Sequence, residues 1–290
     1  MTAPPALGRR IALATGIHYN VLEWAGPADV DLTYVLVHGF TDIAFAWRAV
    51  AETLATRGHV IAPDLRGHGD SDWIGGGGYY YFMDYVADLD DVIRQCARSR
   101  VVLVGHSMGG SVCSYYAGTR PERLTALALL EGLGPPDQST ADGPTRTAMW
   151  IDAWRAARTK SSKVMATLDD AVARLRKHDD LLSLELAREL AERGTKKVDG
   201  GFAWKHDPLH ATFGPYPYRL DTAMKYWAKI TCPTLIVDGV DSKMNLSIDE
   251  RAKRRTCFAN HRYEVVANAG HAIQRHQPAT LAELLLSLQD

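Results

Sequence analysis

The chain has 290 residues, and 33 Lys and Arg against 34 Asp and Glu give it a formal net charge of -1. This balance excludes a strongly basic protein that binds nucleic acid or an acidic membrane surface, and no run of about 18 apolar residues is present that would span a membrane. The length and a hydrophobic fraction of 46% predict one large domain, or one domain that carries an insertion.

Four cysteines occur far apart in the chain, at Cys96, Cys113, Cys232 and Cys257. They form no CxxC pair and have no neighbouring histidine, which excludes a zinc knuckle or a redox motif of the usual spacing. The first ten residues also lack the apolar stretch of a signal peptide. We therefore expect reduced, partly buried thiols in a cytoplasmic protein.

Short apolar runs alternate with helical patterns along most of the chain. The segment 9–25 predicts an opening hairpin. The later runs predict strands at 34–37, 60–62, 101–104, 127–130, 235–237 and 262–266. Helical patterns follow at 44–57, 81–98, 108–119, 246–256 and 273–288. Continuous apolar runs suit strands that helices cover on both faces, so the pattern predicts a mostly parallel, doubly wound α/β sheet.

One long segment interrupts this alternation. Between about Gly134 and Leu220 we expect no strand, and helical patterns of mixed charge occur at 144–158, 161–177 and 180–193. We predict a core formed by residues 1–134 and 221–290, with a helical insertion at 135–220. Because the insertion joins two strands of the sheet, it is a candidate lid over their ends.

The strongest motif is Gly105-His106-Ser107-Met108-Gly109-Gly110, which follows a predicted strand and precedes a predicted helix. The pattern G-x-S-x-G in that context is typical of a sharp turn that presents a serine hydroxyl. The N–H groups at the start of the helix point at any negative charge that develops there. Ser107 is therefore a candidate nucleophile.

Two further strand ends carry residues that suit such a nucleophile. His38-Gly39-Phe40 closes an earlier strand, and the N–H groups of Phe40 and Met108 are candidate oxyanion donors. Gly270-His271 follows the last strand, and His271 is the best placed candidate for the general base. The segment Asp64–Ser71 contains Asp, Arg and His, but such residues in a glycine-rich turn usually bond one another, so we predict a structural role for it.

The motifs HGF, DLRGHGDSD, GHSMGG and a late GH stand in an order and spacing that resemble the α/β-hydrolase superfamily. The resemblance covers nearly the whole chain outside 134–220. Within that superfamily the chain looks most similar to the serine hydrolase-like proteins, whose segments resemble those at 84–89, 130–135 and 241–245 of this chain. The resemblance implies an α/β-hydrolase fold with a helical cap.

The third member of the expected Ser-His-acid triad has two main candidates. Asp241 stands near the position usual in the superfamily, although the spacing from Gly239 is one residue shorter than is common. Glu131 ends an earlier strand, where some relatives place their acid. We favour Asp241, keep Glu131 as the alternative, and expect Asp238 to end its strand without this role.

Aromatic residues gather after the motifs and within the insertion, and they predict an apolar pocket under the cap. The residues that we expect to line it are His38, Gly39, Trp47, His106, Trp150 and Trp154. The partner is then a small-molecule acyl substrate. We expect no nucleic-acid or membrane partner, no metal or organic cofactor, and a monomer or a homodimer.

These residues predict a serine hydrolase that cleaves a small carboxylic ester, thioester or lactone through an acyl-enzyme. Relatives with Asp at the elbow, such as haloalkane dehalogenases and epoxide hydrolases, are disfavoured because position 107 is Ser. The alternatives are hydrolysis of a C–C bond by the same residues, and a lyase or binding protein whose triad is not hydrolytic.

Overall fold

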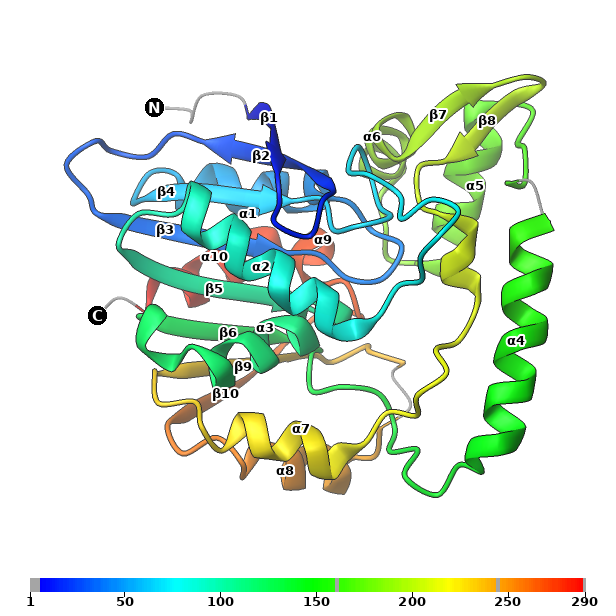
Figure 1. The fold of residues 1–290 in the computed structure, drawn as a ribbon. Helices are drawn as coiled ribbons and strands as arrows, with labels where there is room; N and C mark the ends of the chain where they lie inside the picture. Colours follow the sequence, from blue (N-terminus) through cyan, green and yellow to red (C-terminus); the bar gives the residue numbers. More distant parts are fainter. Residues whose placement is uncertain (1–5, 160–161, 244–245, 289–290) are drawn as a thin grey trace.

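Eight strands form one central sheet, in the spatial order β1-β2-β4-β3-β5-β6-β9-β10 (Figure 1). The computed structural model describes residues 6–159, 162–243 and 246–288. β2 pairs antiparallel with both of its neighbours, and all the other neighbouring strands pair parallel. The strands are β1 (Leu7–Ala12), β2 (His18–Trp24), β3 (Leu32–Val37), β4 (His59–Pro63), β5 (Arg100–His106), β6 (Ala126–Leu130), β9 (Thr234–Gly239) and β10 (His261–Val266).

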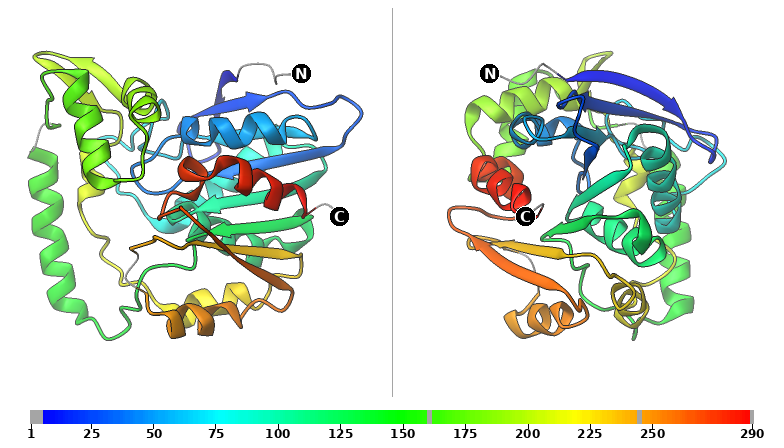
Figure 2. Two further views of the ribbon diagram at one scale, coloured as in Figure 1. Left: turned by 180° about the vertical axis from the view of Figure 1, so that it is seen from behind. Right: turned by 90° about the vertical axis from the view of Figure 1, so that its left-hand side faces the viewer.

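The central strands are buried on both faces, as their continuous apolar runs predict. Every residue of β3, β4, β6 and β9 is buried. One face packs against α2 (Phe82–Cys96), α3 (Met108–Thr119) and α7 (Leu220–Trp227). The other face packs against α1 (Arg48–Leu54) and α10 (Pro278–Leu286), so the sheet lies between two helical layers (Figure 2).

Between β6 and α7, the chain leaves the sheet and lies at the carboxyl ends of the parallel strands (Figure 1). This segment contains α4 (Gly143–Thr159), α5 (Leu168–His178) and α6 (Leu184–Gly194). Thr167 begins α5 with a capping box, in which its hydroxyl and the Asp170 carboxylate each accept from the other's backbone N–H. α5 and α6 bury a small apolar cluster of their own, and that cluster also receives Ile43 from the core.

The expectation that no strand occurs between 134 and 220 is wrong. β7 (Thr195–Val198) and β8 (Gly201–Trp204) form a hairpin in this segment. The turn is Asp199-Gly200, and Gly200 has a φ of +79°. Asp-Gly between two short runs is a hairpin signal because such turns need positive φ. The division into units at residues 134 and 220 stays a prediction.

None of the described helices is long and apolar enough to cross a membrane.

Candidate active site

Ser107 lies in the turn between β5 and α3, with a φ of +51° and a ψ of -119°. Such a backbone costs a residue with a side chain about 1–3 kcal/mol and persists only where its surroundings hold it. The Ser107 N–H donates to the Leu130 carbonyl at 2.9 Å, and the Ser107 carbonyl accepts from the Ser111 N–H at 3.1 Å. The turn therefore holds a half-buried serine side chain at the end of the sheet.

The glycines of the elbow are needed because backbone from neighbouring elements passes close to them. A Cβ at Gly109 would overlap the carbonyl oxygens of Val37 and His38, and one at Gly105 would overlap the Gly109 carbonyl. These contacts let α3 begin directly against the end of β3. The G-x-S-x-G pattern is thus explained by packing as well as by turn geometry.

The two expected oxyanion donors belong to the elbow and to the loop after β3. Met108 is the first residue of α3, and within the described residues neither its N–H nor that of Phe40 donates a hydrogen bond. A Cβ at Gly39 would lie 3.0 Å from the Ser107 Cβ, so the loop before Phe40 passes close to the serine. Both N–H groups are available to an acceptor beside Ser107.

His271 follows β10, and His106 holds its backbone in place. His106 Nε2 lies 2.8 Å from the His271 carbonyl oxygen, so this nitrogen carries the proton and donates. His106 Nδ1 then accepts from the Gln274 side-chain amide at 3.2 Å. Burial, followed by the proximity of His271, lowers the pKa of His106 to about 3. His106 is therefore a neutral, structural neighbour of His271.

Glu131 is the carboxylate that His271 faces. Glu131 Oε2 lies 3.7 Å from His271 Nδ1, a buried atom that makes no hydrogen bond within the described residues. Glu131 Oε1 accepts from the Gly239 N–H at 2.9 Å, and the side chain is 2% exposed. Hydrogen bonds in active sites without substrate are often long, so this separation suits a contact that tightens when His271 becomes charged.

Asp241, which we favoured from the sequence, does not make this contact. Its backbone N–H donates to the Ala269 carbonyl at 2.9 Å, but its side chain is exposed and makes no hydrogen bond or ion pair with another described residue. Asp238 faces Arg251 at 3.3 Å and accepts from the Tyr263 hydroxyl at 3.1 Å. Burial and the nearby Glu131 carboxylate raise the pKa of Asp238.

Helix α8 (Ile248–Arg255) supports the loop that carries Glu131. Arg251 lies 3.7 Å from Glu131 Oε2 and also faces Asp238, so one cation compensates two buried carboxylates. Arg254 is 1% exposed and donates to three successive carbonyls that follow Glu131, those of Leu133, Gly134 and Pro135. Sequence reasoning missed both arginines, because their only signal is a spacing of three residues on one helix.

Ser107 and His271 line one cavity of about 1420 Å³ between the sheet and the segment 135–220. The core contributes residues from the ends of its strands, among them Phe40, Thr41, His106, Asp241 and Gly270. The other wall comes from the insertion, with Ala153, Lys163, Arg174, Leu175, Lys177 and Trp204 among its residues.

Of the six expected pocket residues, only His106 is among those that line this cavity. His38 and Trp47 are fully buried. His38 accepts from the Leu65 N–H at 2.9 Å, and Trp47 packs in the core beside α1 and α10. Gly39 contacts His106 and Ser107 from the side. Trp150 and Trp154 lie on α4, which contributes small residues to the cavity instead.

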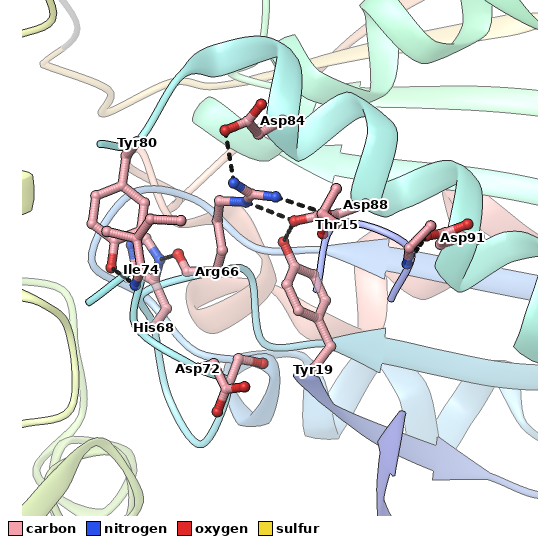
Figure 3. Close-up of polar contacts among 12 residues, drawn as sticks. Thr15, Tyr19, Arg66, His68, Asp72, Ile74, Tyr80, Asp84, Asp88 and Asp91 are labelled. Carbon is pink, nitrogen blue, oxygen red and sulfur yellow. Dashed lines mark hydrogen bonds and ion pairs between the residues drawn. The ribbon is translucent and has the colours of Figure 1, made fainter. Parts of the chain in front are cut away.

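The Asp64–Ser71 segment is held in a buried polar network, in agreement with the predicted structural role. Arg66 binds both oxygens of Asp88 at 2.7 and 2.8 Å and donates to Asp84 at 2.8 Å (Figure 3). The Tyr19 hydroxyl adds a third donor to Asp88 at 2.6 Å. Asp88 and Arg66 are almost fully buried, so this network fixes the loop after β4 to α2.

His68 and His210 form a second buried group, where the insertion meets the core. Their ring centroids lie 4.3 Å apart, and the Tyr80 ring stacks on His210 at 4.0 Å. Burial and the mutual proximity of these histidines lower the pKa of His68, and burial lowers that of His210 to about 3. Within the described part of the chain, no three His, Cys, Asp or Glu side chains are grouped to hold a metal ion.

The curated proteins that are similar to this chain include a serine hydrolase-like protein and an esterase. A serine hydrolase-like protein of Danio rerio is 30% identical over 175 residues, which are 59% of this chain and 53% of that protein. The chain thus spans about half the length of this relative. An esterase of Mycobacterium tuberculosis is 26% identical over 273 residues, which are 93% of this chain and 86% of the esterase.

The fold is also similar to that of a solved thioesterase domain from the curacin biosynthetic pathway. The two chains superpose with a TM-score of 0.87 at 25% identity, covering 98% of this chain and 100% of that domain. The family model of the alpha/beta hydrolase fold matches residues 35–275, which include the elbow serine, Glu131 and His271. The protein therefore belongs to the alpha/beta hydrolase fold family.

Proposed function

We propose that this protein is a serine hydrolase that cleaves a small carboxylic ester, thioester or lactone through Ser107, His271 and Glu131. One observation carries the proposal: the strained elbow holds Ser107 in the same cavity as His271, whose Nδ1 faces the buried Glu131 carboxylate at 3.7 Å. A serine beside an oriented imidazole is suited to attack on acyl carbon.

The proposed reaction has two halves. His271 Nε2 takes the Ser107 proton as Oγ attacks the carbonyl carbon, and the Phe40 and Met108 N–H groups stabilise the tetrahedral oxyanion. The intermediate collapses when His271 returns the proton to the leaving group, which departs and leaves an acyl-enzyme. Water then attacks the acyl carbon with His271 again as base, releasing the acid and restoring Ser107. Each oxyanion donor is worth about 3–4 kcal/mol of barrier in such sites.

Glu131 takes the place that we first assigned to Asp241. A buried carboxylate at Nδ1 keeps the proton on that nitrogen, which leaves Nε2 free to act as the base, and it stabilises the imidazolium that forms. Glu131 supplies this carboxylate because the Gly239 N–H anchors its other oxygen. The exposed Asp241 side chain lacks such a contact within the described residues.

The relatives agree with this class of reaction. The Mycobacterium tuberculosis protein is named an esterase, and the superposed domain is named a thioesterase. Both names describe cleavage at an acyl carbon, which is the step proposed for Ser107.

Turnover of p-nitrophenyl acetate and butyrate tests the proposal. Ser107→Ala should abolish turnover while the thermal midpoint Tm stays close to that of the wild type, because the half-buried hydroxyl makes no hydrogen bond that caps α3. Ser111→Ala, one turn later on α3, is the matched control and should retain turnover within a few-fold. A Ser107→Ala variant that still hydrolyses these esters would show that Ser107 is not the nucleophile.

A further inference from the structure

One side of the active-site cavity carries an excess of positive charge that the proposed reaction does not use. Lys163, Arg174 and Lys177 come from the insertion and line the same cavity as Ser107. Arg174 and Lys177 are three residues apart on α5, so they lie on one face of the helix.

The orientation of α5 follows from its apolar residues. Ala171 and Val172 are buried in the small cluster between α5 and α6, and the face beside them, which carries Arg174, Leu175 and Lys177, lines the cavity. Arg174 is half-buried there, whereas Lys177 is exposed at the same wall. The packing of α5 therefore determines where Arg174 and Lys177 lie.

Most carboxylates of this cavity already have a partner. The pairs are Asp42 with Arg275 at 2.6 Å, Asp179 with His276 at 2.8 Å, and Asp180 with Lys243 at 3.1 Å. Arg275 and Lys243 neutralise one carboxylate each, whereas His276 is charged only when protonated, and Asp179 also faces Arg275 at 3.7 Å.

By contrast, Lys163, Arg174 and Lys177 have no ion pair within 4.0 Å among the residues that the structure describes. Asp170, one turn before Arg174 on α5, is the nearby carboxylate: hydrogen bonds from Thr167 and then the charge of Arg174 lower its pKa. The lining therefore has five Lys and Arg side chains (Lys163, Arg174, Lys177, Lys243 and Arg275) against four carboxylates (Asp42, Asp179, Asp180 and Asp241), and the three cations without an ion pair come from the insertion. Inside a partly enclosed cavity a charge is screened less than on an open surface, so the excess attracts an anion.

The cavity is also larger than a small acyl group requires. Its volume of about 1420 Å³ exceeds the range of about 300–1,000 Å³ that is usual for small-ligand pockets. A substrate can therefore place its scissile carbonyl at Ser107 and extend a second group to the wall formed by α5.

We infer that Arg174 and Lys177, assisted by Lys163, recognise an anionic group that the substrate carries away from its scissile carbonyl. This inference rests on the proposed function and names the substrate class. The anion is either a carboxylate on the acyl part or a phosphate on the leaving group of a thioester. Both present oxygen atoms that Arg and Lys side chains bind with charge-assisted hydrogen bonds.

Two matched substrate pairs test the inference and separate the two sources. Mono-p-nitrophenyl glutarate against p-nitrophenyl valerate tests an acyl carboxylate. Butyryl-coenzyme A against butyryl-N-acetylcysteamine tests a phosphate on the leaving group. The wild type should show a higher kcat/KM for the anionic member of one pair, and raising NaCl from about 0.05 to about 0.5 M should reduce that preference.

Arg174→Gln and Lys177→Gln should each lower this preference by about tenfold, the loss expected for one charge-assisted hydrogen bond, with little change for the neutral substrate. Lys197→Gln is the matched control, because it removes one charge from exposed β7, away from the cavity lining. It should leave the preference unchanged.

The inference is overturned if the wild type hydrolyses neutral esters without preferring either anionic substrate, or if Lys197→Gln reduces the preference as much as Arg174→Gln does. Both outcomes leave the proposed function intact. A folded wild type that hydrolyses none of the four substrates would overturn the proposed function together with this inference.

Discussion

Glu131 and His271 meet across the cavity end of the sheet, with 3.7 Å between Oε2 of the carboxylate and Nδ1 of the imidazole. Glu131 follows β6, and its φ of +49° turns the chain sharply at the end of that strand. The Gly239 N–H binds the other carboxylate oxygen at 2.9 Å. Two neighbouring strands therefore fix one carboxylate toward one histidine.

Replacing Glu131 should remove most of the activity. Glu131→Gln keeps the shape of the side chain but cannot stabilise the imidazolium or favour the Nδ1-protonated form of His271. We expect kcat to fall on the order of 10³–10⁴-fold, as in other triads that lose their carboxylate. Steady-state kinetics with p-nitrophenyl butyrate measures the effect.

Asp241→Asn is the matched control for this prediction, because Asp241 also follows a central strand and lines the cavity. Its kcat should stay within a few-fold of the wild type. If kcat falls on the order of 10³–10⁴-fold in Asp241→Asn but not in Glu131→Gln, the triad acid is Asp241, as the sequence alone favours.

Arg251 should be needed for stability because it faces both Glu131 and Asp238. Arg251→Met leaves two carboxylates, with side chains 2% and 8% exposed, without this cation. Breaking such a buried arrangement costs about 3 kcal/mol or more. Urea unfolding should show the loss as a lower midpoint.

Asp238→Asn tests the cause of that loss. When it is combined with Arg251→Met, only one carboxylate lacks its cation, so part of the lost free energy of unfolding should return. A double variant as unstable as the sum of both single variants would show that Arg251 acts through packing instead.

The Arg66–Asp88 pair should support folding and leave the chemistry unchanged. Arg66→Met leaves Asp88, which is fully buried, with the Tyr19 and Thr15 hydroxyls but no cation. We expect a loss of about 3–5 kcal/mol in the free energy of unfolding. Below the new Tm, kcat per folded molecule should match that of the wild type. A kcat per folded molecule well below the wild-type value would assign this loop a direct role in the reaction.

The protein should lose stability in acid through its buried histidines. The pKa of His106 and that of His210 are each lowered to about 3, and that of His68 is also lowered. A histidine in the unfolded chain has a pKa of about 6.5. Below that pH the unfolded chain binds protons that the folded chain does not, so the free energy of unfolding falls as pH falls. Each such histidine contributes up to about 1.4 kcal/mol per pH unit.

His210→Phe tests this account, because a phenyl ring can occupy the stack between Tyr80 and His68. Urea unfolding between pH 7 and pH 5 should show a shallower loss of stability for the variant than for the wild type. Equal slopes would place the acid sensitivity in other groups.

The sequence predicted the centre of the sheet well because the central strands β3, β4, β6 and β9 are buried on both faces and therefore appear as uninterrupted apolar runs. The β7–β8 hairpin was missed because Thr195–Val198 carries two exposed lysines and lacks such a run. Its one clear signal was the Asp199-Gly200 turn.

The sequence alone could not identify the triad acid or the role of the α5 cations Arg174 and Lys177, because both depend on three-dimensional contacts that residue spacing does not define. Glu131 and Asp241 follow β6 and β9, which are neighbours in the sheet, so both chain positions are close to His271. Only the loop conformations direct one carboxylate inward and the other outward. Likewise, Arg174 and Lys177 look like an ordinary solvated helix face until the cavity beside α5 is known.

The most direct test of the account is the intact mass after treatment with a fluorophosphonate, measured for the wild type, Ser107→Ala and Ser111→Ala. We predict one adduct on the wild type and one on Ser111→Ala, each located at Ser107 by peptide mapping. Ser107→Ala should carry no adduct. An unlabelled, folded wild type, or an adduct that persists in Ser107→Ala, would contradict an activated serine at position 107.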